Sequence, residues 1–425
     1  MTRPLAGLAL AAALAASAPP LRAQDSALVV LETHGNGLSL AKAISLPFEI
    51  ALFPVDLLGH GVNQGLKWVE DRRVIAKVAV TMARIAPFSV RVGGLGEHSG
   101  LGPGLAVAFG DDGDRRWSAG AAANITTPGY QLHTAVLRYR TSHALAMTAF
   151  AEYKVDTQDE FYGTGATSAV GDRSDYRYRR ASAGVGVEWR PAARVMVEAR
   201  AESRREETEG SARNSLILDL EDRFVDRFPA GFLATYPSFR PAVRVGWDGT
   251  RRTARGPLGA LGMLTYGYNR GARNTDPSFH EVDVEARGYV PLGGLRRTLA
   301  LRARVELRRA DRGAIPFYRL AAVGGSRDLR AFRANRFRDT DGVLVTAEYR
   351  YRVWQDDRAG KGLDMVLFAD DGAVVSDIFL GLGASDFHGG YGAGIRLTAR
   401  DVLGRIEVAH GREGTRIQVR AGPLF

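Results

Sequence analysis

The chain has 425 residues, 45% of them hydrophobic and 24% charged, with 50 glycines and no cysteine. This length and apolar content are ample for one large core, so a single β-barrel or β-sandwich could use most of the chain. The lack of cysteine excludes a disulfide scaffold and thiolate metal sites.

Residues 1–23 are typical of a secretory signal peptide. Arg3 provides a positive start, Leu5–Ala16 is an apolar run, and Leu21-Arg22-Ala23 supplies a small-residue cleavage site. We expect cleavage just before Gln24. The alternative is an N-terminal membrane anchor, which the short apolar run disfavours, because a spanning helix needs about 20 residues.

No apolar run after Gln24 is long enough to form a spanning helix. The mature chain is therefore either soluble or a β-barrel. Removing Arg3 and Arg22 from a formal charge of +10 leaves +8. A basic balance often indicates nucleic acid, but an exported chain rarely meets it. We expect instead the phosphate groups of outer-membrane lipid and lipopolysaccharide, or an acidic client protein.

Residues 24–86 differ from the rest of the chain. Between Leu46 and Glu70 apolar residues recur at roughly helical spacing, but Pro54, Gly59 and further breakers interrupt any single helix. We predict a short periplasmic segment with a broken amphipathic helix. This helix either packs against the following domain as a plug or cap, or lies on the inner leaflet as an interfacial helix.

From Pro87 onward the hydrophobic period changes to two, which is typical of strands with one apolar and one polar face. In Leu299–Arg308, for example, leucine, alanine and valine alternate with arginine and glutamate. Ala181–Arg190, Arg194–Glu202 and Glu281–Val290 repeat the pattern. A soluble sandwich would give the same alternation, so the pattern alone does not decide between the two folds.

Three features favour a membrane barrel. The alternation recurs for more than 300 residues, the charged face mixes arginine with glutamate and glycine, and the chain ends in Phe425 on the apolar register of its last strand. In lipid every backbone polar group must be paired, so a sheet without helices must close on itself. The predicted fold is an all-β, transmembrane antiparallel β-barrel over residues 87–425.

We predict about sixteen strands in this barrel. Long connections at 156–175, 205–237, 309–341 and 372–388 all follow odd-numbered strands, so they share the outer side if both chain ends are periplasmic. Short turns such as Arg190–Ala192 fall on the inner side, as is usual for such barrels. The strands are predicted near 87–94, 102–110, 116–126, 130–141, 144–155, 176–189, 193–204, 238–249, 257–269, 278–290, 298–308, 342–352, 363–371, 389–399, 402–410 and 415–425.

Within the third long connection, the pair Gly324-Gly325 is followed by Leu329 and then by Arg330-Ala331-Phe332. This order resembles the sixth-loop signature of the bacterial surface antigen superfamily, the BamA-like outer-membrane barrels, in which Arg-Gly-Phe or Arg-Gly-Tyr follows a glycine pair. The match is strong over residues 316–425 and weaker over 87–315. Thr346–Arg350, Leu367–Gly372 and Phe161–Gly165 resemble further family segments.

The resemblance implies that residues 309–341 fold inward as the sixth loop. It also implies that Arg330 is held by carboxylates on the inner wall, here Glu348 and Asp370. The residues agree, because both carboxylates lie on charged registers, and a guanidinium between two carboxylates forms directional, charge-assisted bonds. The alternative is that these are three among many lumen charges.

Two departures from the family pattern bear on function. Ala331 stands where the family has glycine, which would cost about 1 kcal/mol if the position required positive φ. Residues 24–86 are too few for more than a fragment of a POTRA repeat, so the chain resembles the subgroup lacking POTRA domains. Client capture would then require a separate periplasmic partner.

The sequence offers no constellation for catalysis or for binding a cofactor. The eight histidines lack metal-ligand spacing, no Gly-x-Ser-x-Gly elbow is present, and Gly100–Gly104 opens a strand rather than a helix. We therefore expect no enzyme activity, no cofactor and no metal. The arginine-rich stretch Arg327–Arg338 either faces lipopolysaccharide phosphate or forms a solvated or lumen-packed loop.

The resemblance implies a barrel that inserts or translocates protein or lipid at the outer membrane. Such a barrel is itself inserted by the barrel assembly machinery through a C-terminal signal, here ending in Phe425. The predicted first strand, Phe88–Gly94, is short and ends in two glycines, which weakens its pairing. One alternative is a passive or gated pore, which a charged lumen and sixteen strands would also suit. A membrane lipase is a weaker alternative.

Overall fold

The structure is a computed structural model that describes residues 88–96, 99–100, 102–110, 116–211, 217–253, 256–356, 361–399 and 401–421, and the backbone of residues 29–32. The predicted signal peptide, the predicted broken helix and Phe425 lie outside the described residues. Within them, no helix has both the length and the apolar character needed to cross a bilayer.

The described chain consists almost entirely of strands, with four short helical turns. The strands are β1 (Val29–Glu32), β2 (Phe88–Gly93), β3 (Gly102–Phe109), β4 (Trp117–Ile125), β5 (Gln131–Arg140), β6 (Leu145–Phe161), β7 (Ser174–Ala192), β8 (Val195–Gly210), β9 (Thr235–Asp248), β10 (Arg251–Thr253), β11 (Gly256–Gly271), β12 (Ser278–Pro291), β13 (Arg297–Arg312), β14 (Ala321–Val323), β15 (Phe337–Asp339), β16 (Asp341–Asp356), β17 (Lys361–Val375), β18 (Phe387–Ala399), β19 (Asp401–Gly411) and β20 (Gly414–Ala421). The helical turns are η1 (Val170–Asp172), α5 (Leu220–Arg223), η2 (Phe317–Arg319) and η3 (Ala384–Asp386).

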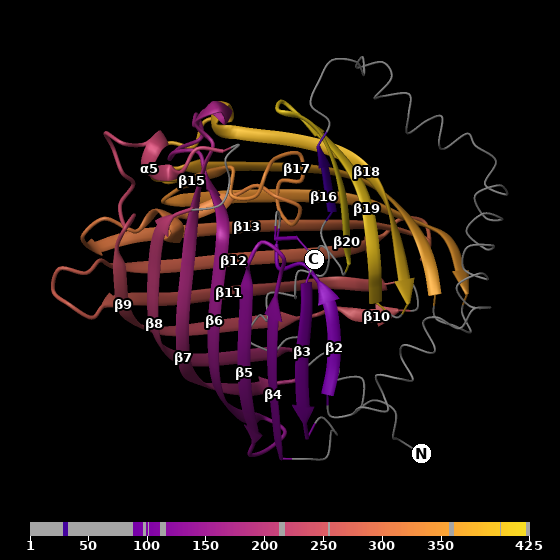
Figure 1. Cartoon of the computed structure of the whole chain (residues 1–425). Coiled ribbons are helices and arrows are strands. Elements are labelled where there is room, and N and C mark those ends of the chain that lie inside the picture. The colour runs from indigo at the N-terminus through magenta and orange to yellow at the C-terminus, as the bar shows by residue number, and fades with distance from the viewer. Residues whose placement is uncertain are drawn as a thin grey trace.

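Sixteen of these strands form one antiparallel series from β2 to β20. Consecutive strands pair from β2 through β9, then β9 pairs with β11, β11 with β12, β12 with β13, β13 with β16, and β16 through β20 in order. Figure 1 shows the series as a strongly curved wall, with β2–β9 in front and β11–β17 crossing behind. The predicted all-β class and the predicted number of strands are confirmed.

The two-residue period determines which side chains face outward. On β13, Leu301 is 41% exposed and Arg302 only 7%, and on β7, Val185 is 60% exposed and Glu188 only 6%. Successive side chains on a strand point to opposite faces. The apolar set therefore covers the outside of the wall and the charged set lines its inside, as in a lipid-facing barrel with a polar interior.

The strands continue further at their outer ends than the sequence pattern predicted. β6 runs to Phe161 and β8 to Gly210, each six residues beyond its predicted end, so the outer loops are shorter than predicted. Apolar side chains no longer alternate with polar ones there, but the backbone pairing continues. Charged side chains on neighbouring strands form the cross-strand pairs in this part of the wall. Arg177 of β7, for instance, lies 3.0 Å from the Glu209 carboxylate of β8.

The two ends of the series, β2 and β20, form the seam of the wall. β2 pairs with β3 over six residues. β20 pairs with β19 and, through Val29–Glu32, with β1. Among the described residues no register joins β2 to β20. A short segment near the N-terminus therefore lies along the edge of the last strand as an added antiparallel strand.

Ala303 faces outward at the centre of the apolar stretch Leu299–Leu307 of β13, so an arginine there would place a charge in the bilayer core. We expect Ala303→Arg to destabilise the folded barrel by about 2–4 kcal/mol, and Leu292→Arg, in the short turn after β12, by about 0–1 kcal/mol. Urea titration in liposomes measures both changes. Equal effects at the two positions would contradict this assignment of the outer face.

Candidate functional site: a loop locked inside the barrel

Residues Gly313–Thr340 connect β13 to β16 and are named the β13–β16 loop. Its hairpin of β14 and β15 carries a tip between them. Gly324 and Gly325 begin the tip with φ values of 129° and 97°. A side chain at Gly324 would overlap the backbone of Arg333. Glycine is therefore required where the chain turns into the tip.

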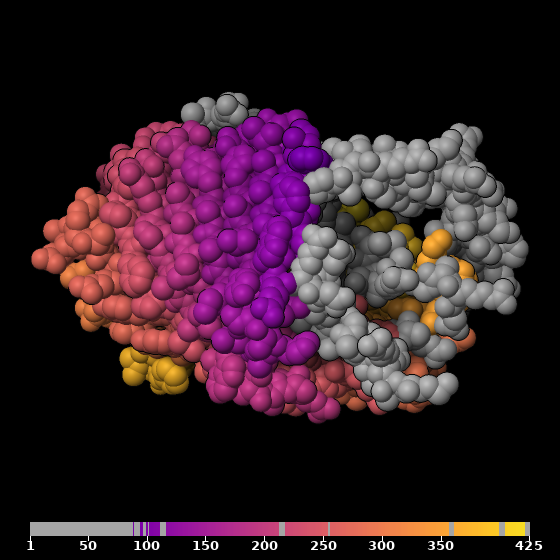
Figure 2. Space-filling model, turned by 90° about the horizontal axis from the view of Figure 1, so that it is seen from below, coloured from indigo at the N-terminus to yellow at the C-terminus, as the bar shows by residue number. Residues whose placement is uncertain are grey.

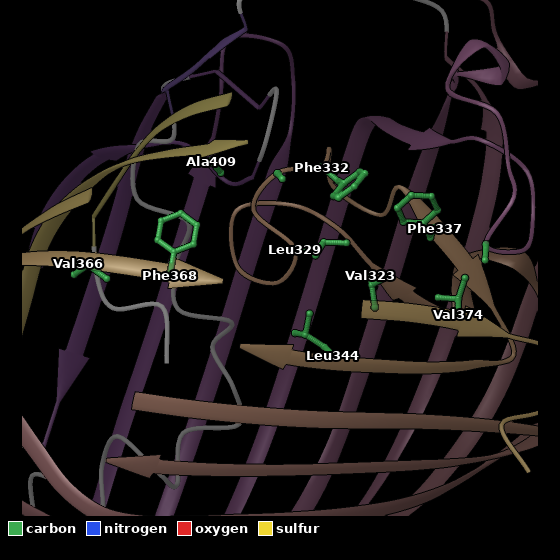
Figure 3. Close-up of a cluster of buried hydrophobic side chains, with 11 residues drawn as sticks. Val323, Leu329, Phe332, Phe337, Leu344, Val366, Phe368, Val374 and Ala409 are labelled. Carbon is green, nitrogen blue, oxygen red and sulfur yellow. The ribbon is translucent and has the colours of Figure 1, made fainter. Parts of the chain in front are cut away.

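Apolar side chains of the tip are packed within the wall. Leu329, Ala331 and Phe332 are each at most 1% exposed, and they form a cluster with Phe368 of β17 and Ala409 of β19. Figure 3 shows Leu329 and Phe332 on the loop, near Phe368 and Ala409 on the surrounding strands. The tip is thus enclosed by the barrel, which corresponds to the lumen-packed alternative for the arginine-rich stretch.

Arg330 lies at the centre of this tip and is 0% exposed. Its Nε and Nη2 donate to the two oxygens of Asp370 at 2.7 and 2.8 Å, a two-pronged contact. Its Nη1 donates to Glu348 Oε1 at 2.7 Å. The guanidinium carbon also lies 3.4 Å from the ring centre of Phe368, a cation–π arrangement. The structure thus brings together the three residues that the family resemblance singled out.

Sequence reasoning missed three further members of this network. Glu407 of β19 accepts from Arg330 Nη1 at 3.2 Å. Arg396 of β18 donates to Glu348 at 2.6 Å and to Glu407 at 3.2 Å. Gln418 of β20 donates to the backbone carbonyl of Arg330 at 2.7 Å. All three lie on the lumen register of their strands, so the two-residue period carried a signal. The period does not show which lumen residues meet, because that depends on how the wall curves.

Burial determines how strongly these groups depend on one another. Glu348, Asp370 and Glu407 are each at most 2% exposed, and a buried carboxylate without a partner is costly. Arg330 and Arg396 compensate these charges, together with Arg350 beside Glu348 and Arg405 beside Glu407. Since the carboxylates come from β16, β17 and β19, one guanidinium attaches the loop tip to three strands at once.

The loop is also attached on the opposite side of the barrel. Asn335 donates to Asp159 Oδ1 of β6 at 3.1 Å, and Arg336 donates to Ser168 Oγ at 2.8 Å. Asn335 has φ of 54°, a conformation that asparagine adopts more readily than most residues. β6 and β17 are the fifth and thirteenth of the sixteen strands, so the loop reaches across the lumen.

The base of the loop packs on the same side as Asn335. Phe317, 1% exposed, contacts Phe161 edge-on with ring centres 4.9 Å apart. Tyr162, which follows Phe161 in the chain, is buried, and its hydroxyl donates a hydrogen bond to Glu160. Burial and the Glu160 carboxylate raise the pKa of Tyr162, so the phenol remains a neutral donor. Two segments with family resemblance, far apart in sequence, are therefore in contact.

A third attachment lies on β13. Arg304 donates from Nη1 and Nη2 to the two oxygens of Asp328, each at 3.0 Å. The loop is therefore held at three sectors of the wall and obstructs the lumen. In the described part of the chain, no group of three or more His, Asp or Glu side chains could hold a metal ion.

Ala331 replaces the family's glycine without backbone strain. The described non-glycine residues with positive φ are Leu233 and Asn335, so Ala331 is not one of them. Its methyl group instead faces two glycines, because a side chain at Gly390 of β18 or at Gly411 of β19 would overlap the Ala331 Cβ. The penalty of about 1 kcal/mol for positive φ does not apply here.

The comparisons with known proteins agree with this fold. A model of the Omp85 superfamily domain matches residues 120–418. The chain belongs to the Omp85 superfamily, a class of outer-membrane barrels that act in protein insertion or translocation. The family predicted from the loop signature is thereby confirmed, and with it an outer-membrane location.

Two solved structures are similar in fold. BamA from Haemophilus ducreyi lacking POTRA domains 1-3 has a TM-score of 0.57 and 11% identity, covering 79% of this chain and 70% of that one. CdiB from Escherichia coli has a TM-score of 0.52 and 12% identity, covering 79% of this chain and 62% of that one. The chain thus spans about two thirds of each of these structures. No curated protein matches the sequence.

Replacing Arg330 by methionine would leave the buried carboxylates undercompensated. We expect Arg330→Met to lower the free energy of unfolding by about 3–5 kcal/mol and to release the tip, which would raise the ion conductance in planar bilayers. Arg177→Met is the control, because the Arg177–Glu209 pair is about one third exposed and should contribute about 0–1 kcal/mol. Unchanged conductance and stability in Arg330→Met would argue against the lock.

The contact between Ala331 and Gly390 can be tested by exchanging alanine and glycine between the two positions. We expect Gly390→Ala to destabilise the docked tip by about 1–3 kcal/mol through overpacking, and a second change, Ala331→Gly, to restore most of that loss. Gly288→Ala on β12 is the control, because nothing lies within 4 Å of an added methyl there. Thermal unfolding is compared for the wild type, the two single variants, the double variant and the control. Additive losses in the double variant would show that the two sites do not interact.

Proposed function

We propose that this protein inserts or translocates proteins, or lipids, at the outer membrane, and that the client passes through the seam between β2 and β20. The weakness of that seam carries the proposal. β2 pairs over only six residues, whereas β7 is nineteen residues long. The edge of β20 is occupied by only four residues of β1.

Strand edges are reactive surfaces. An unpaired edge presents a row of N–H and C=O groups that readily bind another strand. In lipid no water can satisfy those groups, so pairing with an incoming strand is especially favourable. The antiparallel pairing of Val29–Glu32 with β20 supports the view that this edge accepts an extended segment, and a client strand would replace that segment.

The obstructed lumen supports the same route. The β13–β16 loop is attached to β17 through Arg330 and to β6 through Asn335. An axial path would require the loop to leave both β17 and β6, whereas a lateral path through the seam would disturb only its contacts with β19 and β20. A passive pore, the alternative function, would need a lumen that conducts steadily while Arg330 remains in place.

We further propose that a separate periplasmic protein presents the client to the seam. The support is the resemblance of the chain to Omp85 barrels lacking POTRA domains. Co-purification from outer membranes, followed by identification of stoichiometric partners, addresses this part of the proposal independently of the route that the client takes.

A disulfide at the seam tests the lateral route. The chain has no cysteine, so cysteines at Val29 of β1 and Val419 of β20, which lie opposite each other, give one cross-link that fixes β1 on the edge that a client strand would use. We expect the oxidised protein to insert a reporter barrel into vesicles at least tenfold more slowly than the reduced protein. Full activity with a sealed seam would rule out lateral passage.

A second cysteine pair supplies the control. Val408 and Ile417 lie opposite each other in the β19–β20 pairing, so a disulfide between them cross-links two strands that are already joined. This protein should keep its activity when oxidised. Equal losses in the seam and control proteins would attribute the effect to oxidation and contradict a specific role for the seam.

A further inference from the structure

The loop between β17 and β18 carries an unusually exposed apolar pair. Phe379 is 78% exposed and Leu380 is 87% exposed, more than any other large apolar side chain in the described residues. Exposed apolar groups of this size are unfavourable in water unless something covers them. The loop lies at the outer end of its strands, following Val375 of β17.

A hydrogen-bonded turn presents this pair. The backbone N–H of Phe379 donates to Asp377 Oδ1 at 2.9 Å, and the N–H of Ile378 donates to Asp341 Oδ2 at 2.9 Å. The N–H of Gly381 donates to the carbonyl of Asp377 at 3.3 Å. Hydrogen bonds at both ends of the turn hold the apolar pair at its apex.

The turn leans onto the outer surface of the wall. Arg309 of β13 lies on the same face as the lipid-facing Leu301, eight residues earlier in an alternating strand. Arg309 Nη2 is 3.2 Å from Asp377 Oδ1, and its guanidinium lies 5.9 Å from the ring centre of Phe379. The β17–β18 loop therefore reaches past β16 to the outward face of β13. Figure 2 shows a gold-coloured protrusion from this late part of the chain extending beyond the barrel outline.

Residues on β11 and β12 show where the Arg309–Phe379 contact lies along the barrel axis. His280 of β12 pairs opposite Arg309, and its Nδ1 is 2.8 Å from the hydroxyl of Tyr266 on β11. Tyr266 is 44% exposed and follows the exposed Leu264 on the same face. Outward tyrosines directly beyond an apolar band are typical of the membrane–water boundary of barrels. Phe379 thus lies at the outer boundary of the bilayer.

We propose that Phe379 and Leu380 are a lipid anchor that inserts into the outer leaflet beside β13. Phe379 contacts Arg309 on the outward face of β13, and the level of the membrane boundary given by Tyr266 places the pair within reach of acyl chains. Arg309 stays at the level of the headgroups, where its charge is compensated by Asp377 and Asp341. The anchor concerns the placement of the barrel and does not depend on the proposed insertion activity.

A fluorescent label at Leu380 tests the anchor. Leu380→Cys, in a chain that otherwise has no cysteine, is labelled with nitrobenzoxadiazole and reconstituted in vesicles of phosphatidylcholine and phosphatidylglycerol. We expect a blue-shifted emission and at least threefold stronger quenching by nitroxide-labelled lipid than for the control, Val170→Cys in η1. Val170 is 53% exposed and lies two residues from Ser168, which contacts the lumen loop.

The possible outcomes distinguish contact of the anchor with lipid from contact with water or with another protein. Water-like emission and quenching at Leu380 equal to that at Val170 would overturn the proposal, and so would protection that appears only when another protein is added. Phe379→Cys, labelled in the same way, provides a second reading if the first variant does not fold. Folding of each labelled protein is verified by its heat-modifiable migration on a gel.

Discussion

The interior of this barrel is organised around one buried guanidinium. Arg330 is enclosed by Asp370, Glu348 and Glu407, which reach it from three different strands. A planar group with five donors suits this position, because it can satisfy several carboxylates in fixed directions, which a lysine ammonium does not. The charges are costly to bury but costlier to separate. The loop tip is therefore held where the charges meet, and wall side chains also donate to its backbone carbonyls at Ser326, Arg327 and Arg330.

The outside of the wall obeys a different constraint. Strands in lipid must pair their backbone groups with other strands, and long pairings such as β6–β7 satisfy this requirement. The interior can therefore contain irregular chain, because the surrounding wall shields it from lipid. The β13–β16 loop uses that freedom. Its glycine turn at Gly324 and its left-handed Asn335 would be poor elements of a membrane-exposed strand.

Much of this could be predicted from the sequence, because the two-residue period is a local property. It gave the number of strands and the face on which Glu348 and Asp370 lie. The outer ends of β6 and β8 could not be placed, since charged residues replace apolar ones there while pairing continues. Glu407 and Arg396 were missed because their roles arise from three-dimensional curvature. The tolerance of Ala331 was unpredictable for the same reason, since it depends on Gly390 in another strand.

The lock and the seam are physically connected. Glu407 lies on β19, and Gln418, which donates to the carbonyl of Arg330, lies on β20, the strand at the seam. Any outward movement of β20 must stretch or break the Gln418 bond and, through β19, disturb the carboxylates around Arg330. Conversely, a docked tip holds the last two strands in place. If the protein opens at its seam, its energy cost therefore includes part of the lock, and a client strand that pairs with β20 must supply hydrogen bonds in return. The docked loop and the seam are therefore energetically coupled, because the loop restrains the strand edge that a client strand would use.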